Sequence, residues 1–151
     1  MKIILDKVKE NDSELLFRLL EYSLFEESFY DGNEMNQEGI FDYPDFSLYY
    51  TSQDKEAFFI KDNQTKNLLG FIMIDNVTNK HQIKEFMILP NYRRKHIGKE
   101  AAFLSFNRYH GDWEVSPSMG SNTAHHFWKN VIQEYTNHNY QYQNGIFNFN
   151  K

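Results

Sequence analysis

The sequence contains no cysteine, which excludes a thiol nucleophile, a disulfide framework and a cysteine-based zinc site. It also lacks a long apolar run, since the longest, residues 68–74, is far shorter than the ~20 residues that a membrane helix needs. The N-terminus reaches Asp6 and Lys7 after three apolar residues, too few for a signal peptide. These absences predict a protein of a reducing compartment, the cytoplasm, with no membrane partner.

Positive charge is also in short supply, because 16 Lys and Arg stand against 21 Asp and Glu, a formal charge of −5. With a pI near 5.6, the chain lacks the broad basic surface that nucleic-acid binding needs, so we expect no nucleic-acid partner. The average conceals two unlike halves. Residues 1–56 carry 5 basic and 14 acidic side chains (−9), whereas residues 57–151 carry 11 and 7 (+4). Two interpretations are open: two ligands of opposite charge, or a solvated acidic helix face.

Linkers, low-complexity tracts and internal repeats are absent as well, so we expect residues 1–151 to form a single domain. Aromatic residues, by contrast, are abundant: they make up 17% of the chain, with 14 Phe, 10 Tyr and 2 Trp. Each ring buries a large apolar area, so the sequence predicts a core built more from Phe and Tyr than from aliphatic side chains. A chain of ~150 residues buries about two-thirds of its unfolded surface and needs no disulfides.

Hydrophobic periodicity alternates between the helical and the strand pattern along the chain. Near the C-terminus, Asn144-Gly145 suits a two-residue hairpin turn with positive φ. The mixture predicts an α+β fold. The expected elements are strand 1–8, helix 12–29, a short helix at 33–40, strands 56–61, 68–75 and 82–89, helix 97–109, strand 113–116, helix 121–134 and a terminal hairpin.

The densest chemistry lies at residues 85–99, where a predicted strand ends in a basic loop that opens a helix. Backbone N–H groups at a helix start lack internal partners and, together with the helix dipole, bind anions. Gly98 would let the backbone approach a ligand, and four Lys and Arg add charge, so the loop suits a diphosphate. Lys99 is followed by Glu100, which excludes a Walker phosphate loop, and only one glycine of the dinucleotide fingerprint is present.

Residues 93–98, Arg-Arg-Lys-His-Ile-Gly, resemble the acyl-CoA pyrophosphate loop of the GNAT superfamily of N-acetyltransferases, whose pattern is Arg/Gln-x-x-Gly-x-Gly/Ala. Residues 85–93 match that family's acid–apolar–x–apolar–x–Pro–x–Tyr–Arg lead-in, and residues 121–128 resemble its Asn-x-x-Ala-x-x-(Leu/Phe)-(Tyr/Trp) segment. The resemblance covers residues 68–136, while residues 1–56 match in element order only. It implies a mixed central sheet of about six or seven strands flanked by about four helices.

Three departures from the family pattern bear on mechanism. Ser121, rather than Asn122, aligns with the family's Asn, and which of the two serves is open. The family's usual tyrosine proton donor aligns with Trp128, whose indole N–H cannot give up a proton at neutral pH. His96 replaces the first Gly of the loop, which we expect to be harmless provided that its φ is negative.

Acetyl transfer to an amine requires that the ammonium first lose a proton, so a base beside the strand end helps. The resemblance implies Glu85 as this base, acting directly or through a water; the alternative is a rim carboxylate that pairs with Lys84 or Arg93. The departing thiolate also needs a proton. The candidate donors are Tyr135, which we place with Glu85 as the second catalytic residue, and Tyr92, His125 and Ser121.

The resemblance also implies acetyl-CoA as co-substrate and residues 12–50 as the acceptor side of a cleft. Acidic and aromatic side chains there would suit a small cationic amine through charge and cation–π contact. For the basic loop the alternative is a solvated run of charge. Expected cofactor-binding residues are Met87, Ile88, Arg93, Arg94, Lys95, His96, Ile97, Gly98, Lys99, Asn122 and Trp128, and expected acceptor-binding residues are Glu26, Glu27, Phe29, Tyr30 and Asp31.

No metal site is expected. His125 and His126 are adjacent, so on a helix they point about 100° apart, and residues 31–34 lack the ligand spacing of a calcium loop. The predicted function is an acetyl-CoA-dependent N-acetyltransferase that acts on a primary amine. Open alternatives are a non-catalytic acyl-CoA-binding module, favoured by the missing tyrosine, and an interaction protein that kept only the fold. An exposed strand edge would allow a homodimer.

Overall fold

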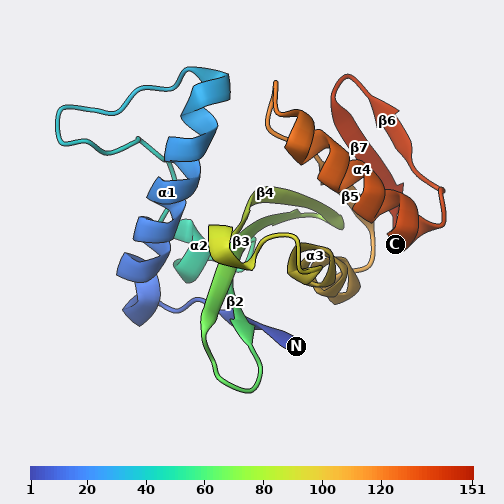
Figure 1. The fold of residues 1–151 in the computed structure, drawn as a ribbon, viewed down its shortest axis with the longest axis horizontal. Coiled ribbons are helices and arrows are strands. Elements are labelled where there is room, and N and C mark those ends of the chain that lie inside the picture. The colour runs from blue at the N-terminus through green and yellow to red at the C-terminus, as the bar shows by residue number, and fades with distance from the viewer.

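The computed structural model describes residues 1–151 and contains one mixed seven-stranded sheet (Figure 1). No helix in it is both long and apolar enough to span a membrane. Short 3₁₀ turns lie at Glu10–Asp12 and Pro90–Tyr92. The main elements are β1 (Ile3–Lys7), α1 (Ser13–Asp31), α2 (Leu48–Thr51), β2 (Lys55–Asp62), β3 (Leu68–Val77), β4 (Lys80–Ile88), α3 (Ile97–Arg108), β5 (Asp112–Val115), α4 (Asn122–Thr136), β6 (Gln141–Gln143) and β7 (Ile146–Asn150).

Strands β1 to β4 form an antiparallel meander in which each strand pairs with the next along the chain. β4 then pairs in parallel with β5, which is reached through the crossover helix α3. β7 lies between β5 and β6, so the strand order is β1-β2-β3-β4-β5-β7-β6. In Figure 1, β5, β6 and β7 lie with α4 on one side of β4, and β2 and β3 lie on the other. The predicted α+β fold with a mixed sheet and four helices is confirmed.

One face of the sheet is covered by α1 and α2. Side chains of a strand alternate between the two faces, so every second residue of the meander points to these helices. Leu16 and Leu20 of α1 and Tyr49 of α2 are buried against Phe59 and Phe71. This packing fixes α1 beside the middle of the sheet, where the acidic residues of its last two turns reach the end of β4.

The opposite face is covered by α3 and α4, and its core is aromatic as predicted. Trp113 of β5 stacks on Phe149 of β7 with ring centroids 6.4 Å apart, and Phe106 of α3 packs edge-on against both, at 5.1 and 4.9 Å. Trp128 of α4 belongs to the same buried cluster. Edge-to-face and offset-stacked pairs of this kind add stability beyond the area that they bury.

The prediction of a helix at residues 33–40 is wrong. The side-chain oxygen of Asn36 accepts hydrogen bonds from the backbone N–H groups of Glu38 and Ile40, and Gly39 has a φ of +75°. A local turn of this kind competes with the helical hydrogen-bond ladder. The short helix of this region lies further on, as α2. The terminal hairpin is as expected, with φ of +54° at Asn144 and +77° at Gly145.

Candidate active site

The central strand β4 loses one of its two neighbours halfway along its length. It pairs with β5 over residues 80–83 only, whereas its pairing with β3 continues to residue 88. From residue 84 to residue 88, the edge of β4 that faces β5 therefore has no strand partner. Backbone N–H and C=O groups need hydrogen-bond partners, so this edge is available to an extended ligand.

A β-bulge in β4 directs Glu85 toward α1. The register between β3 and β4 shifts at this point, and Lys84 is the extra residue. Beyond the bulge, alternation places Glu85 on the same face as Met87, which packs in the cluster covered by α1. Bulges often lie beside active sites, where they re-aim a side chain.

Glu85 lines a cleft of about 170 Å³ between the diverging strands. One wall comes from β4 and the other from the end of β5 and the segment that follows it. From the two opposite faces of the sheet, α1 and α4 each add one residue. A larger and more open depression of about 450 Å³ lies near the start of α1, but it contains only one charged group of each sign, Glu14 and Arg18. The smaller cleft gathers the acid–base groups; it is lined by Glu27, Ile83, Lys84, Glu85, Phe86, Val115, Ser116, Pro117, Ser118 and Trp128.

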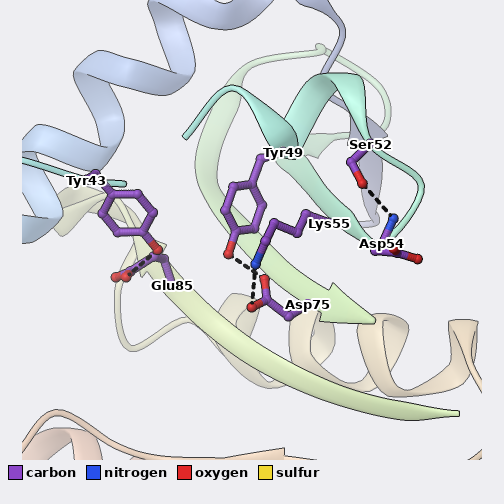
Figure 2. Close-up of polar contacts among 7 residues, drawn as sticks. All are labelled: Tyr43, Tyr49, Ser52, Asp54, Lys55, Asp75 and Glu85. Atoms are coloured by element: carbon purple, nitrogen blue, oxygen red, sulfur yellow. Dashed lines mark hydrogen bonds and ion pairs between the residues drawn. The ribbon is translucent and has the colours of Figure 1, made fainter. Parts of the chain in front are cut away.

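Burial raises the pKa of Glu85 to about 8, and the nearby Glu27 carboxylate adds to that rise. Two contacts act in the other direction: the Tyr43 hydroxyl donates a hydrogen bond to Oε2 of Glu85 at 3.0 Å, and Lys84 contributes positive charge. Figure 2 shows the phenol of Tyr43 pointing at the Glu85 carboxylate. A carboxyl that titrates near neutral pH in a cleft is a candidate general base.

Glu27 of α1 is the second acid of the cleft. Burial, followed by the neighbouring Asp31 carboxylate, raises its pKa, and the Ser118 hydroxyl offsets part of that rise. Its partner segment, residues 116–121, approaches the end of α1 at a further point, since Gly120 lies beside the Tyr30 ring. Two carboxyl groups with raised pKa values in one small cleft favour a cationic ligand.

The basic loop bends through two left-handed residues, Arg94 and His96, each with a φ of +63°. The condition under which His96 would be a harmless replacement, a negative φ, is therefore not met. His96 is the N-terminal flanking residue of α3, and it adopts the conformation for which the family's glycine is suited. A histidine thus adopts a backbone conformation that favours glycine, which costs ~1–2 kcal/mol of folding free energy.

Of the four basic side chains of this loop, two form ion pairs with acidic residues and two do not. Nη1 and Nη2 of Arg93 donate to the Glu26 carboxylate at 3.2 and 2.9 Å, and its Nε donates to the Ile88 carbonyl at 2.7 Å. Lys99 pairs with Glu134 of α4 at 3.3 Å. Arg94 and Lys95 form no ion pair, so they are the charges most available to a diphosphate.

Gly98 permits close packing of α3 on α4. A side-chain carbon at this position would lie 2.9 Å from Cε1 of Phe127. The Phe127 ring in turn contacts Phe86 of β4 and Trp128, at centroid distances of 5.7 and 5.0 Å. In the structure, the neighbour that requires glycine is therefore a ring that packs behind two aromatic residues of the cleft lining, Phe86 and Trp128.

The start of α4 separates the roles of Ser121 and Asn122. Ser121 is buried, and its Oγ accepts a hydrogen bond from the Ala124 backbone, so it caps the helix. Asn122 is exposed at the first helical position. Trp128 is only 6% exposed, and it is both part of the core and a wall of the cleft.

The structure does not bring Tyr135 to Glu85. Its hydroxyl donates to Oδ1 of Asn107 on α3 at 2.7 Å, its ring packs on Phe106, and it lies outside the cleft lining. The other candidate donors also lie outside: the Tyr92 ring lies under the Lys95 ammonium group, and the remaining two, His125 against Phe147 and Ser121 as a helix cap, are engaged elsewhere.

Of the predicted acceptor residues, only Glu27 lines the cleft directly. Glu26 pairs with Arg93 instead. Phe29 is 85% exposed and Tyr30 is half-exposed, with their rings edge-to-face at 5.2 Å. Asp31, exposed at the end of α1, acts on the cleft through its charge.

Sequence reasoning missed two contributors, the hydroxyls of Tyr43 and Ser118. Tyr43 stood out only as one of several aromatic residues in an acidic segment, and its partner is 42 residues away. Ser118 belongs to a segment without periodicity. No local pattern identifies either residue, because both depend on how the segments pack across β4.

The chain matches the model of one protein family. The model of the acetyltransferase (GNAT) family matches residues 19–107, which is more than half of the chain. The matched region contains Glu27, Tyr43, Glu85 and the basic loop. A search of curated proteins found no match.

Solved structures share the fold at low sequence identity. A domain from Methanocaldococcus jannaschii has a TM-score of 0.67 at 17% identity and covers 99% of each chain. PaiA N-acetyltransferase from Thermoplasma acidophilum, in complex with coenzyme A, has a TM-score of 0.59 at 16% identity over 100% of each chain. Spermidine N-acetyltransferase from Vibrio cholerae, with CoA and spermine, has a TM-score of 0.61 at 13% identity and covers 98% of this chain and 95% of its own.

Proposed function

This chain belongs to the acetyltransferase (GNAT) family, and we propose that it transfers the acetyl group of acetyl-CoA to the primary amine of a small cationic acceptor. The observation that carries the proposal is Glu85, a cleft carboxyl whose pKa is raised to about 8. It lies where β4 separates from β5, on the strand that leads into the basic loop. A base and an anion site are thereby joined by one short stretch of backbone.

Glu85 would act as the general base. An alkyl ammonium with a pKa of ~10 must lose a proton before its nitrogen can attack the acetyl carbon. Proton transfer to an ordinary carboxylate costs roughly 8 kcal/mol, whereas transfer to a group with a pKa of about 8 costs roughly 3 kcal/mol. The nitrogen then bonds to the acetyl carbon, the carbon–sulfur bond breaks, and CoA leaves as the thiolate. Glu85 holds the first proton of the ammonium, and the nitrogen loses its second proton to solvent as the neutral amide forms.

Acetyl-CoA supplies the activated carbonyl, and the protein holds it in place. The unpaired edge of β4 at residues 84–88 would bind the extended part of the molecule, including its acyl end. Backbone N–H groups of residues 93–98 and the side chains of Arg94 and Lys95 would bind the diphosphate. None of the four donors that the sequence suggested lines the cleft, so CoA would leave as the thiolate.

The acceptor would be a small amine that carries further positive charge. Glu27 and Glu85 line the cleft and Asp31 stands beside them, so a cation finds several carboxylates within a short span. The spermidine N-acetyltransferase from Vibrio cholerae has the same fold and was solved with spermine, which is an amine of this kind.

A second candidate is a non-catalytic acyl-CoA-binding module. The observation that favours it is Trp128, which lines the cleft with an indole in place of the family's usual tyrosine and cannot act as an acid. Both candidate functions predict that the protein binds acetyl-CoA, but only the acetyltransferase releases CoA from it.

Thiol release from acetyl-CoA with a panel of mono-, di- and polyamines tests the proposal. We expect turnover with cationic amines, a loss of at least 100-fold in kcat for Glu85→Gln, and unchanged activity for Glu10→Gln, an exposed carboxyl outside the cleft. Calorimetric binding of acetyl-CoA without any thiol release would favour the binding module. A fully active Glu85→Gln variant would refute the assigned base.

A further inference from the structure

We propose that Tyr43 is a positioning residue that fixes the Glu85 carboxylate by one oxygen and leaves the other as the proton-accepting atom. The Tyr43 hydroxyl binds Oε2 at 3.0 Å, and Oε1 accepts no hydrogen bond from the protein. Oε1 is also not sealed in the interior, since no buried polar side-chain atom lacks a partner. The inference rests on the proposed role of Glu85 as the base.

Tyr43 is itself held on both sides. Upstream, the Glu21 carboxylate accepts the Phe41 backbone N–H at 3.2 Å. Downstream, the Tyr49 hydroxyl donates to the Asp75 carboxylate, which Lys55 also binds at 2.9 Å. Figure 2 shows the two phenols side by side, each directed at a different carboxylate of the meander.

The Tyr43 hydroxyl remains a neutral donor. Burial, and then the Glu85 charge, raises its pKa above the ordinary value of a tyrosine. A neutral donor bonded to a carboxylate stabilises the charged form. The bond from Tyr43 therefore lowers the pKa of Glu85 and offsets part of the rise that burial causes. Other groups also face the Glu85 carboxyl. From α1, Glu27 and Asp31 raise its pKa, whereas Lys84 of β4 lowers it. The Tyr49 phenol of α2 faces it as well.

Tyr43→Phe removes this one oxygen and keeps the ring. A hydrogen bond to a charged group corresponds to a shift of ~1–2 pKa units, so the acidic limb of the kcat profile should move upward by that amount. At neutral pH we expect kcat to fall ~10- to 100-fold, with KM for acetyl-CoA unchanged and much of the rate restored at alkaline pH. A merely structural role would lower activity at every pH.

Tyr50→Phe is the matched control, because it removes a hydroxyl from the same segment, on a ring that packs against Phe46 and lies outside the cleft lining. Its pH profile should stay where the wild-type profile lies. Equal shifts in the two variants, or no shift in Tyr43→Phe, would overturn the proposal.

A titration without substrate separates this inference from the proposed function. Carbon-13 NMR of labelled glutamate carboxyl groups, with Glu85→Gln to identify the resonance, follows Glu85 in the wild type and in both tyrosine variants. An upward shift in Tyr43→Phe alone supports the positioning role even if no amine is acetylated. An unshifted Glu85 resonance refutes the positioning role even if the wild type is an active acetyltransferase.

Discussion

Replacement of Glu85 by glutamine should make the protein more stable while it removes the proposed base. Folding raises the pKa of Glu85 from 4.5 to about 8, so between these values the native state binds a proton that the unfolded chain has released. Stability therefore falls as pH rises through this window. Glutamine stays neutral and its carbonyl oxygen can still accept from Tyr43, so the variant should escape this loss.

The magnitude follows from the two pKa values. The destabilisation that Glu85 causes by ionising amounts to about 1 kcal/mol at pH 5, roughly 3 kcal/mol at pH 7 and roughly 5 kcal/mol at pH 9. For a chain of this size, each kcal/mol corresponds to ~2–4 °C in Tm. Glu85→Gln should therefore gain stability over the wild type progressively with pH, with most of the gain above pH 6.

Urea unfolding of the wild type and Glu85→Gln at pH 5, 7 and 9 measures this gain. All other titrating groups are common to both proteins, so the difference between the two curves isolates position 85. Glu10→Gln, at an exposed site, should run parallel to the wild type at every pH. A stability difference between wild type and Glu85→Gln that does not grow with pH would refute the argument from burial.

Three further variants test other parts of the site. Arg94→Ala with Lys95→Ala should weaken acetyl-CoA binding at least ~10-fold by calorimetry, more at low salt than at high salt, because exposed charges are screened; unchanged affinity would contradict the diphosphate assignment. His96→Gly should raise Tm by ~2–8 °C by relieving the left-handed backbone, whereas a lower Tm would contradict that interpretation. Glu27→Gln removes a carboxylate that raises the pKa of Glu85. Its pH–rate profile should move to lower pH and KM for a cationic amine should rise; a shift to higher pH would contradict this.

The opposite charges of the two halves of the chain meet in one contact. Glu26, from the acidic half, and Arg93, from the basic half, form a two-point ion pair between α1 and the basic loop. Both side chains are about half-exposed, so the pair adds little stability. Substitution of either one would disturb both proposed ligand sites, and Glu27 and Arg94 are therefore the cleaner probes of the acceptor and the cofactor.

Local patterns in the sequence were sufficient for the element order, the terminal hairpin and the place of the basic loop. Periodicity and turn chemistry act over a few residues, so Asn144-Gly145 forms its turn wherever the hairpin lies. Glu85 was identified differently, through the family resemblance of the strand–loop–helix segment that it begins. The helix predicted at 33–40 failed because Asn36 forms a competing turn.

Only the tertiary structure decided which groups meet in the cleft. Tyr43 reaches Glu85 across 42 residues of chain, and Glu26 reaches Arg93 across 67. Tyr135, which the sequence suggested as the acid, is directed to Asn107 instead. Such contacts depend on how helices pack on the two faces of the sheet and on where β4 leaves β5. The raised pKa of Glu85 arises from the same packing, because desolvation is a property of the folded surroundings rather than of the residue.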